Sequence, residues 1–70
     1  MNILVIDAQG GGIGRQLVTA IKAAMPDACI TAVGTNSAAT AAMVKAKADK
    51  AATGENAVVV GCRHTDIIIG

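Results

Sequence analysis

Residues 3–15, Ile-Leu-Val-Ile-Asp-Ala-Gln-Gly-Gly-Gly-Ile-Gly-Arg, decide the fold. Four consecutive branched apolar residues, 3–6, are typical of a parallel strand that is buried on both faces. A glycine-rich run follows, and from Ile13 apolar residues recur at helical spacing, at Leu17, Val18, Ile21, Ala24 and Met25. This order of strand, glycine-rich turn and amphipathic helix is the one that opens a Rossmann-like α/β domain.

The rest of the chain continues the alternation of helix and strand. Pro26 and Asp27 end the first helix, and the apolar stretch 29–33, closed by Gly34, predicts a second strand. Asn36 or Ser37 caps a second helix that runs to about Ala48, with Ala39, Ala42, Met43 and Ala46 on one face. Short strands are expected at 51–53 and 66–69. We therefore predict a three-layer, Rossmann-like α/β parallel sheet, forming one domain over residues 1–70.

The stretch from residue 54 to 63 supports two interpretations. Parallel strands need a crossover, which favours a short helix from Gly54 to Arg63. The three consecutive valines, 58–60, prefer a strand instead, and would place 57–61 antiparallel to 66–70. The helix is the preferred interpretation, and the antiparallel pair stays open.

The length of the chain limits its core. A chain of 70 residues buries only about 60% of the surface that its unfolded form exposes. The last predicted strand also leaves an apolar edge, which proteins usually cover. We expect either that this is the N-terminal portion of a longer, truncated domain or that a homo-oligomer covers the edge, and truncation is the preferred interpretation.

Composition argues against several classes of partner. Six Lys and Arg residues are nearly balanced by five acids, and the chain has no aromatic side chain, so nucleic-acid binding is not expected. Neither a membrane span nor a secretory leader is recognisable, and the two cysteines do not suggest a disulfide framework, which favours a cytoplasmic protein. Cys62 and His64 offer at most two metal ligands, so no metal site is expected.

The glycine-rich segment, Ala8 to Gly14, has the setting of a phosphate-binding loop. Glycines let the backbone approach a phosphate, and the start of the following helix supplies N–H groups and a positive dipole end. The strict G-x-G-x-x-G spacing fails, because Arg15 stands where a glycine is needed. The spacing resembles the G-x-x-x-G-x-G loop of short-chain dehydrogenases and reductases, with Ala8 in place of the first glycine.

Two other interpretations of the loop compete. It also resembles a deviant phosphate loop of NTPases, but Arg15 and Gln16 stand where that loop has Lys and Ser or Thr, which argues against ATP hydrolysis. The segment could also be only a tight turn between a strand and a helix.

Further polar residues follow the other predicted strands. Ligands of doubly wound sheets bind beyond the carboxyl ends of the strands, so these residues could line one crevice with the loop. Helix capping by Asn, Ser and Thr is the alternative role. The residues predicted to bind a cofactor are Asp7, Gln9, Gly10, Gly11, Gly12, Ile13, Gly14, Arg15, Gly34, Thr35, Asn36, Thr53, Glu55 and Asn56. For Asp7, anchoring of the loop backbone is an equal expectation.

The identity of the cofactor is weakly constrained. NAD-binding sheets usually carry an acid at the end of the second strand, and Gly34-Thr35-Asn36-Ser37 has none, which argues slightly against NAD. NADP or NAD is a candidate, and a small phosphate-bearing ligand is the expected partner. A short-chain reductase would also need a catalytic tyrosine, and this chain has none. Catalysis is therefore an open question, with oxidoreductase as the class if there is any.

Five blocks together resemble a small bacterial family described only as a domain of unknown function. They are residues 5–7, 9–15, 32–36 (Ala-Val-Gly-Thr-Asn), 52–57 (Ala-Thr-Gly-Glu-Asn-Ala) and 66–70, and the likeness covers essentially the whole chain. The resemblance implies a Rossmann-like fold without an established activity. It also implies a chain about twice as long, with glycine where Ala8 stands.

The sequence thus favours a nucleotide- or dinucleotide-binding protein. A non-catalytic regulatory or assembly subunit that keeps the fold is the first alternative. A degenerate phosphate-loop NTPase is the second.

Overall fold

A computed structural model of the chain describes residues 1–8, 12–54, 56–57 and 63–70. In chain order the elements are β1 (Asn2–Asp7), α1 (Gly12–Ala24), β2 (Cys29–Gly34), α2 (Ser37–Lys45), β3 (Lys50–Thr53) and β4 (Ile67–Ile69). All six were predicted from the sequence, with bounds that differ by one residue except at the end of α2. That helix ends three residues before Ala48, because the backbone turns at Lys47, whose φ is +79°.

The four strands of the described residues form one sheet in the order β3-β2-β1-β4. Each pairing between them is parallel, and residues 3–5 of β1 pair with β2 on one side and with β4 on the other. The chain therefore moves outward from β1 to β3 and then returns to the other side of β1. This reversal beside the first strand is consistent with a Rossmann-like fold.

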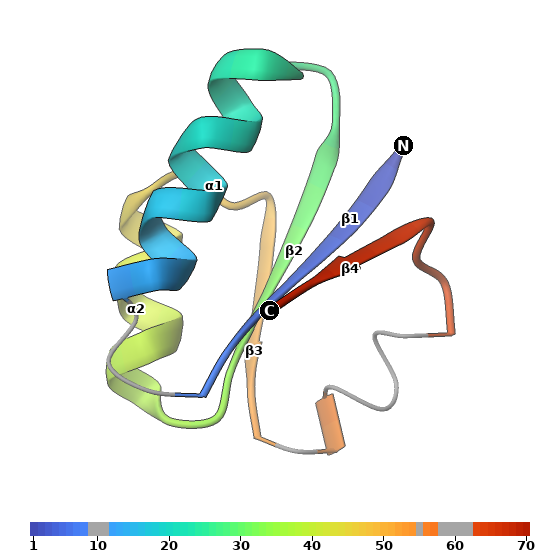
Figure 1. Cartoon of the computed structure of the whole chain (residues 1–70). Coiled ribbons are helices and arrows are strands. Elements are labelled where there is room, and N and C mark those ends of the chain that lie inside the picture. The colour runs from blue at the N-terminus through green and yellow to red at the C-terminus, as the bar shows by residue number, and fades with distance from the viewer. Residues whose placement is uncertain (9–11, 55, 58–62) are drawn as a thin grey trace.

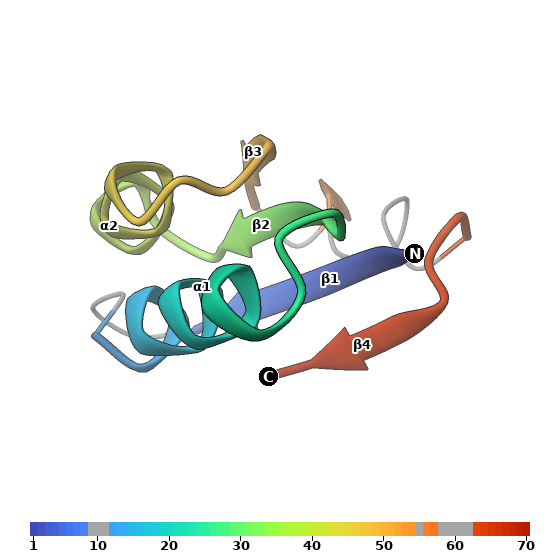
Figure 2. The ribbon, with the colours of Figure 1, turned by 90° about the horizontal axis from the view of Figure 1, so that it is seen from above.

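Both helices lie on the same face of the sheet (Figures 1 and 2). Of the connection from β3 to β4, the described residues 56–57 and 63–66 lie on the opposite face (Figure 2). That face is where the third layer of a doubly wound domain is built. The helix expected over 54–63 and its rival strand over 57–61 fall largely outside the described residues.

The core lies between the sheet and the helices. Its buried members are Ile3, Val5, Val18, Ala28, Ile30, Ala32 and Met43. Leu4 and Val33 alternate with these strand residues and are buried as well, at 0% and 1% exposure. Strand β1 is thus buried on both faces, which confirms the inference from its run of apolar residues.

The predicted apolar faces of the helices are confirmed in their centres. Ala39 and Met43 of α2 are fully buried, and Leu17 and Ile21 of α1 pack against the core beside Val18. Ile13 and Met25 follow the same spacing but are 69% and 39% exposed. Ile13 lies in the first turn of α1, and Met25 lies just after its last residue. The helical spacing was predicted correctly, but these two residues are not buried.

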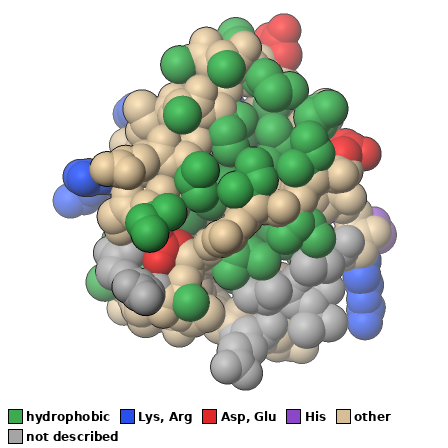
Figure 3. Space-filling model, in the orientation of Figure 1, with side chains coloured by type: hydrophobic (Ala, Val, Ile, Leu, Met, Phe, Trp, Pro, Cys, Tyr) green, Lys and Arg blue, Asp and Glu red, His purple; other side chains and the backbone are tan. Residues whose placement is uncertain are grey.

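Strand β4 forms an apolar edge of the described sheet. Ile67 and Ile68 are 39% and 51% exposed, and apolar side chains gather on the face that carries α1 and β4 (Figure 3). Among the described residues, neither helix has the length and the continuous apolar character needed to cross a lipid bilayer.

Asp49 connects three parts of the chain at the end of the sheet where the strands β2 and β3 begin. Its Oδ2 accepts hydrogen bonds from Ile30 N at 2.8 Å and from Lys22 Nζ at 2.6 Å. Lys22 Nζ also donates to Ala28 O at 3.2 Å. The hydrogen bond from Ile30, and then the one from Lys22, lower the pKa of Asp49. The contact joins α1, the start of β2 and the segment before β3.

We expect Asp49→Asn to lower the urea midpoint of unfolding modestly at pH 7, because the charge on the acceptor of two hydrogen bonds is lost and the site is solvent-exposed. Because folding lowers this pKa, the stabilisation is present above the ordinary value of about 4 and disappears as the pH falls through the lowered value. The difference between wild type and variant should therefore shrink below about pH 4. Asp27→Asn, in an exposed turn, is the control, and a difference that does not change with pH would contradict the assignment.

Candidate functional site

The carboxyl ends of three strands form one row. Asp7, Gly34 and Thr53 are neighbours in the sheet register. Two backbone hydrogen bonds continue this row into the loops, from Thr35 N to Asp7 O at 3.1 Å and from Gly54 N to Gly34 O at 2.9 Å. The polar residues that follow the strands in the sequence are thus brought to one edge, as the parallel topology predicts.

Asp7 anchors the start of α1 to the end of β1. Its side chain is buried, and Oδ2 accepts a hydrogen bond from Gly14 N at 2.8 Å. The carboxylate thereby satisfies one of the first N–H groups of the helix and places negative charge at the positive end of the helix dipole. Of the two expectations for Asp7, anchoring of the loop backbone is the one that the structure supports.

Gly12 and Gly14 differ in their surroundings. A Cβ added at Gly14 would lie 2.6 Å from Met43 Sδ and 2.9 Å from Asp7 Oδ2. A Cβ at Gly12 would meet no atom of the described residues within 4 Å. Gly14 therefore allows α1 to pack closely between β1 and α2, whereas Gly12 faces open space. Gln9, Gly10 and Gly11 lie outside the described residues.

At the end of β2, the polar residues have structural partners. Asn36 caps α2, since its Oδ1 accepts a hydrogen bond from Ala39 N at 2.9 Å. Gly34 is packed tightly, because a Cβ there would lie 2.6 Å from Thr40 N. Thr35 is exposed beside them. The capping role that the sequence offered as the alternative for Asn36 is present in the structure.

At the end of β3, Thr53 bonds to a residue that the sequence did not single out. Its Oγ1 lies 2.7 Å from Thr40 Oγ1, which also donates to Asn36 O and lies 3.3 Å from Ala52 O. The signal for Thr40 is its position four residues after the cap, where a threonine hydroxyl reaches back to a backbone carbonyl. Asn56 is exposed, and Glu55 lies outside the described residues.

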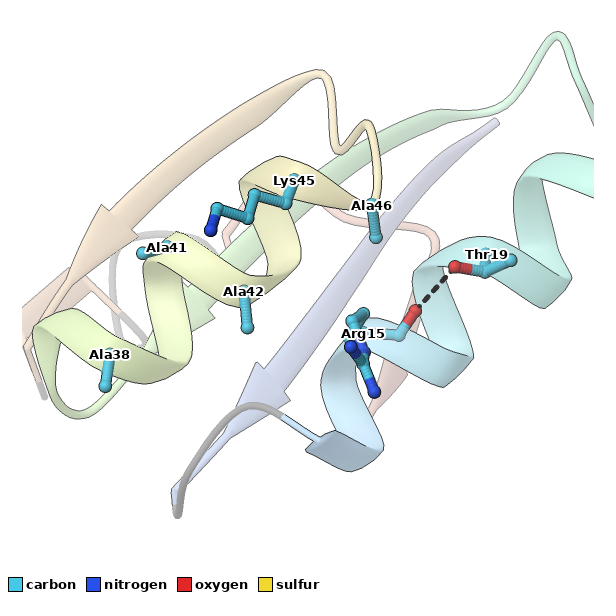
Figure 4. A pocket seen from close by; sticks show the side chains of 7 residues that line it. All are labelled: Arg15, Thr19, Ala38, Ala41, Ala42, Lys45 and Ala46. Carbon is cyan, nitrogen blue, oxygen red and sulfur yellow. Dashed lines mark hydrogen bonds between the residues drawn. The ribbon is translucent and has the colours of Figure 1, made fainter.

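Arg15 lines a groove between the two helices (Figure 4). The other lining residues are Thr19, Ala38, Ala41, Ala42, Lys45 and Ala46. Ile13 is exposed in the first turn of α1. Of the described candidates near the loop, Arg15 is the only cation, and it faces this groove.

The chemistry available at the row of strand ends is that of hydroxyl, amide and backbone groups. In the part of the chain that the structure describes, no group of three His, Cys, Asp or Glu side chains could hold a metal ion. Attraction for an anion at this edge would come from the N-terminal turn of the 13-residue helix α1, and the Asp7 carboxylate bonded to Gly14 N offsets part of that attraction.

These features define a small α/β protein with an all-parallel, Rossmann-like sheet and a glycine-rich connection after its first strand. The chain belongs to the family described as Domain of unknown function (DUF3842), whose model matches residues 2–70. This confirms the resemblance to a domain of unknown function that the sequence indicates. No curated protein and no solved structure matches the chain.

Gly14→Ala should destabilise the fold by about 1–3 kcal/mol, because the added methyl group would displace Met43 or the Asp7 carboxylate. Gly12→Ala should change stability by less than about 0.5 kcal/mol, since its methyl group points into open space. Urea unfolding of both variants tests this difference. Equal loss of stability in the two variants would show that the two glycines do not have different roles.

Proposed function

We propose that this chain binds a nucleotide or dinucleotide through the loop from Ala8 to Gly14. The observation that carries the proposal is the position of this loop, which follows β1 where the strand order reverses between β2 and β4. Ligands of open parallel sheets bind beyond the carboxyl ends of the strands at such a reversal.

Two local features support a phosphate as the group bound. Gly12 stands at the first position of α1, and no atom of the described residues occupies the place of its side chain, so a ligand atom could approach the backbone closely. The start of the helix offers N–H groups and a positive dipole end. Asp7 already accepts the hydrogen bond from Gly14 N, so the amide of Gly14 is not offered to the phosphate in this proposal.

The rest of the ligand would extend along the row of strand ends. Thr35 is exposed beside β1 and is suited to contact the sugar, and Asn56 is exposed beyond β3. The side chains of Asn36 and Thr53 already form hydrogen bonds within the fold, so we expect them to contribute less to ligand binding than their positions at the strand ends suggest. The end of β2 carries neither a carboxylate for ribose hydroxyls nor an arginine for a 2′-phosphate, which argues slightly against NAD and does not select NADP.

Gly12→Val should abolish nucleotide binding without unfolding the chain. The valine would fill the open space beside the loop, and the backbone at Gly12 is outside the left-handed region that only glycine adopts readily. Isothermal titration with NADP, NAD, ATP and GTP measures affinity, and circular dichroism checks the helices. Ala24→Val, at the exposed other end of α1, is the matched control.

Two results would reject this proposal. Unchanged affinity in Gly12→Val would exclude the loop as the phosphate site. Absence of binding by the wild-type chain to all four ligands at millimolar concentration would exclude the nucleotide function itself.

A second candidate, an assembly subunit, is favoured by the apolar edge at β4. Ile67 and Ile68 expose apolar surface on the outermost strand of the described sheet, and such an edge is a template for pairing with another chain. Another copy would cover this surface in a homo-oligomer.

Light scattering tests this second candidate. The mass of the wild-type chain should rise with concentration, and Ile68→Lys should return it to that of a monomer, because burying the lysine at the edge is costly. Arg63→Glu, exposed in the segment before β4, is the control. A wild-type monomer at every concentration would exclude assembly through β4.

A further inference from the structure

The groove between α1 and α2 has an apolar floor on a surface that faces solvent. Its lining is built largely from alanines, at 38, 41 and 42 in α2 and at 46 directly after it. In Figure 4, Ala42 and Ala46 point toward α1, and Arg15 reaches into the space between the helices. The small side chains leave a hollow where larger ones would close the contact between the helices.

The outward face of α2 is unusual for a helix on a protein surface. Such helices normally carry polar and charged residues on the side away from the core. Here Ala38, Ala41 and Val44 are exposed, with Val44 at 49%, and Lys45 is the one charged residue of the helix. This composition is typical of a helix that is covered on both sides.

The charges beside the groove are all of one sign. Arg15 and Lys45 line it, and no Asp or Glu is among the described residues that do so. Neither the guanidinium group of Arg15 nor the ammonium group of Lys45 has a hydrogen bond or ion pair within the described part of the chain. The hydroxyl of Thr19, between them in the lining, donates to Arg15 O at 2.9 Å and so adds no negative charge.

We propose that this groove docks a helix of a different protein, one with a narrow face of small apolar residues flanked by carboxylates. Small side chains on both partners let a helix lie in the groove at the close end of the usual 8–10 Å between axes, and the carboxylates pair with Arg15 and Lys45. Charge complementarity at the rim of such a contact selects the partner.

A second copy of this chain is a poor occupant. Two-fold docking of the groove on itself would bring Arg15 and Lys45 of both copies together, and like charges in contact are costly. The acids in the described residues are buried, paired or outside the helices. Asp7 is buried and accepts from Gly14 N, Asp49 pairs with Lys22, Asp66 accepts from Asn2 N, and Asp27 lies in the turn after α1.

The test uses the whole chain labelled with ¹⁵N and two synthetic helical peptides. Both peptides carry the same alanine stripe; one has Glu and the other Lys on the two sides of it. We expect the Glu peptide to shift the amide signals of the first half of α1 and of α2, with an affinity that falls as salt is added. The Lys peptide should cause no such shifts.

A charge-reversed variant sharpens the test. Arg15→Glu combined with Lys45→Glu should lower the affinity of the chain for the Glu peptide at least about tenfold and allow the Lys peptide to bind. Both side chains are exposed, so circular dichroism should show an unchanged fold. Lys47→Glu combined with Arg63→Glu makes the same change in net charge outside the groove, and so controls for long-range electrostatic attraction. It should leave the affinity for the Glu peptide within about twofold of the wild-type value.

Four results would overturn the proposal. They are absence of shifts with the Glu peptide, equal binding of the two peptides, equal effects of the two double variants, and shifts at the groove that depend on the concentration of the chain alone. A DNA duplex that shifts the same amides while the Glu peptide does not would assign the groove to nucleic acid instead.

Discussion

The hydrogen bond from Gly14 N to the buried carboxylate of Asp7 is the contact on which the rest of the described structure depends. It joins the end of the central strand to the first turn of α1, and so fixes both ends of the glycine-rich connection. It also offsets two costs at once, because a buried carboxylate and an unpaired helical N–H each need a partner. The contact fixes the start of α1 against the end of β1, whereas the face on which both helices lie follows from the right-handed crossovers between parallel strands.

Most polar residues at the strand ends serve the fold before they serve a ligand. Asn36 caps α2, and the hydroxyls of Thr40 and Thr53 join that helix to β3. These bonds bring the ends of β2 and β3 into a fixed arrangement beside β1. A ligand that contacts the ends of β2 and β3 would therefore meet side chains already held by hydrogen bonds, and would lose less of its binding energy to ordering them.

The sequence was sufficient to predict the secondary-structure elements and the parallel α/β class, because its local signals agree with one another. The apolar run of β1, the helical spacing after Ile13 and the short strands each point to a parallel sheet, and the structure has these elements. The strand order could not be predicted, since it depends on how the chain crosses the sheet between β3 and β4. The prediction that Ile13 belongs to the apolar face of the helix was wrong about its burial. Periodicity indicates which face of a helix is apolar, but not at which residue the helix begins to pack against the core.

For the candidate site, the sequence predicted the edge but could not assign roles within it. Gly12 and Gly14 look alike as residue types, and only packing separates open space at one from contact with Met43 at the other. The role of Thr40 was not predicted from the sequence, because it depends on a contact with Thr53, 13 residues away along the chain. Ligand binding itself stays a prediction.

The loop and the helical groove are linked through one turn of α1. Gly14 is wedged between Asp7 and Met43, and Arg15, the next residue, lines the groove. A ligand that moved the start of α1 would have to break the bond to Asp7 and would shift Arg15 as well. Because that bond is buried, the first turn is better suited to act as a rigid support for both surfaces than as a moving part between them.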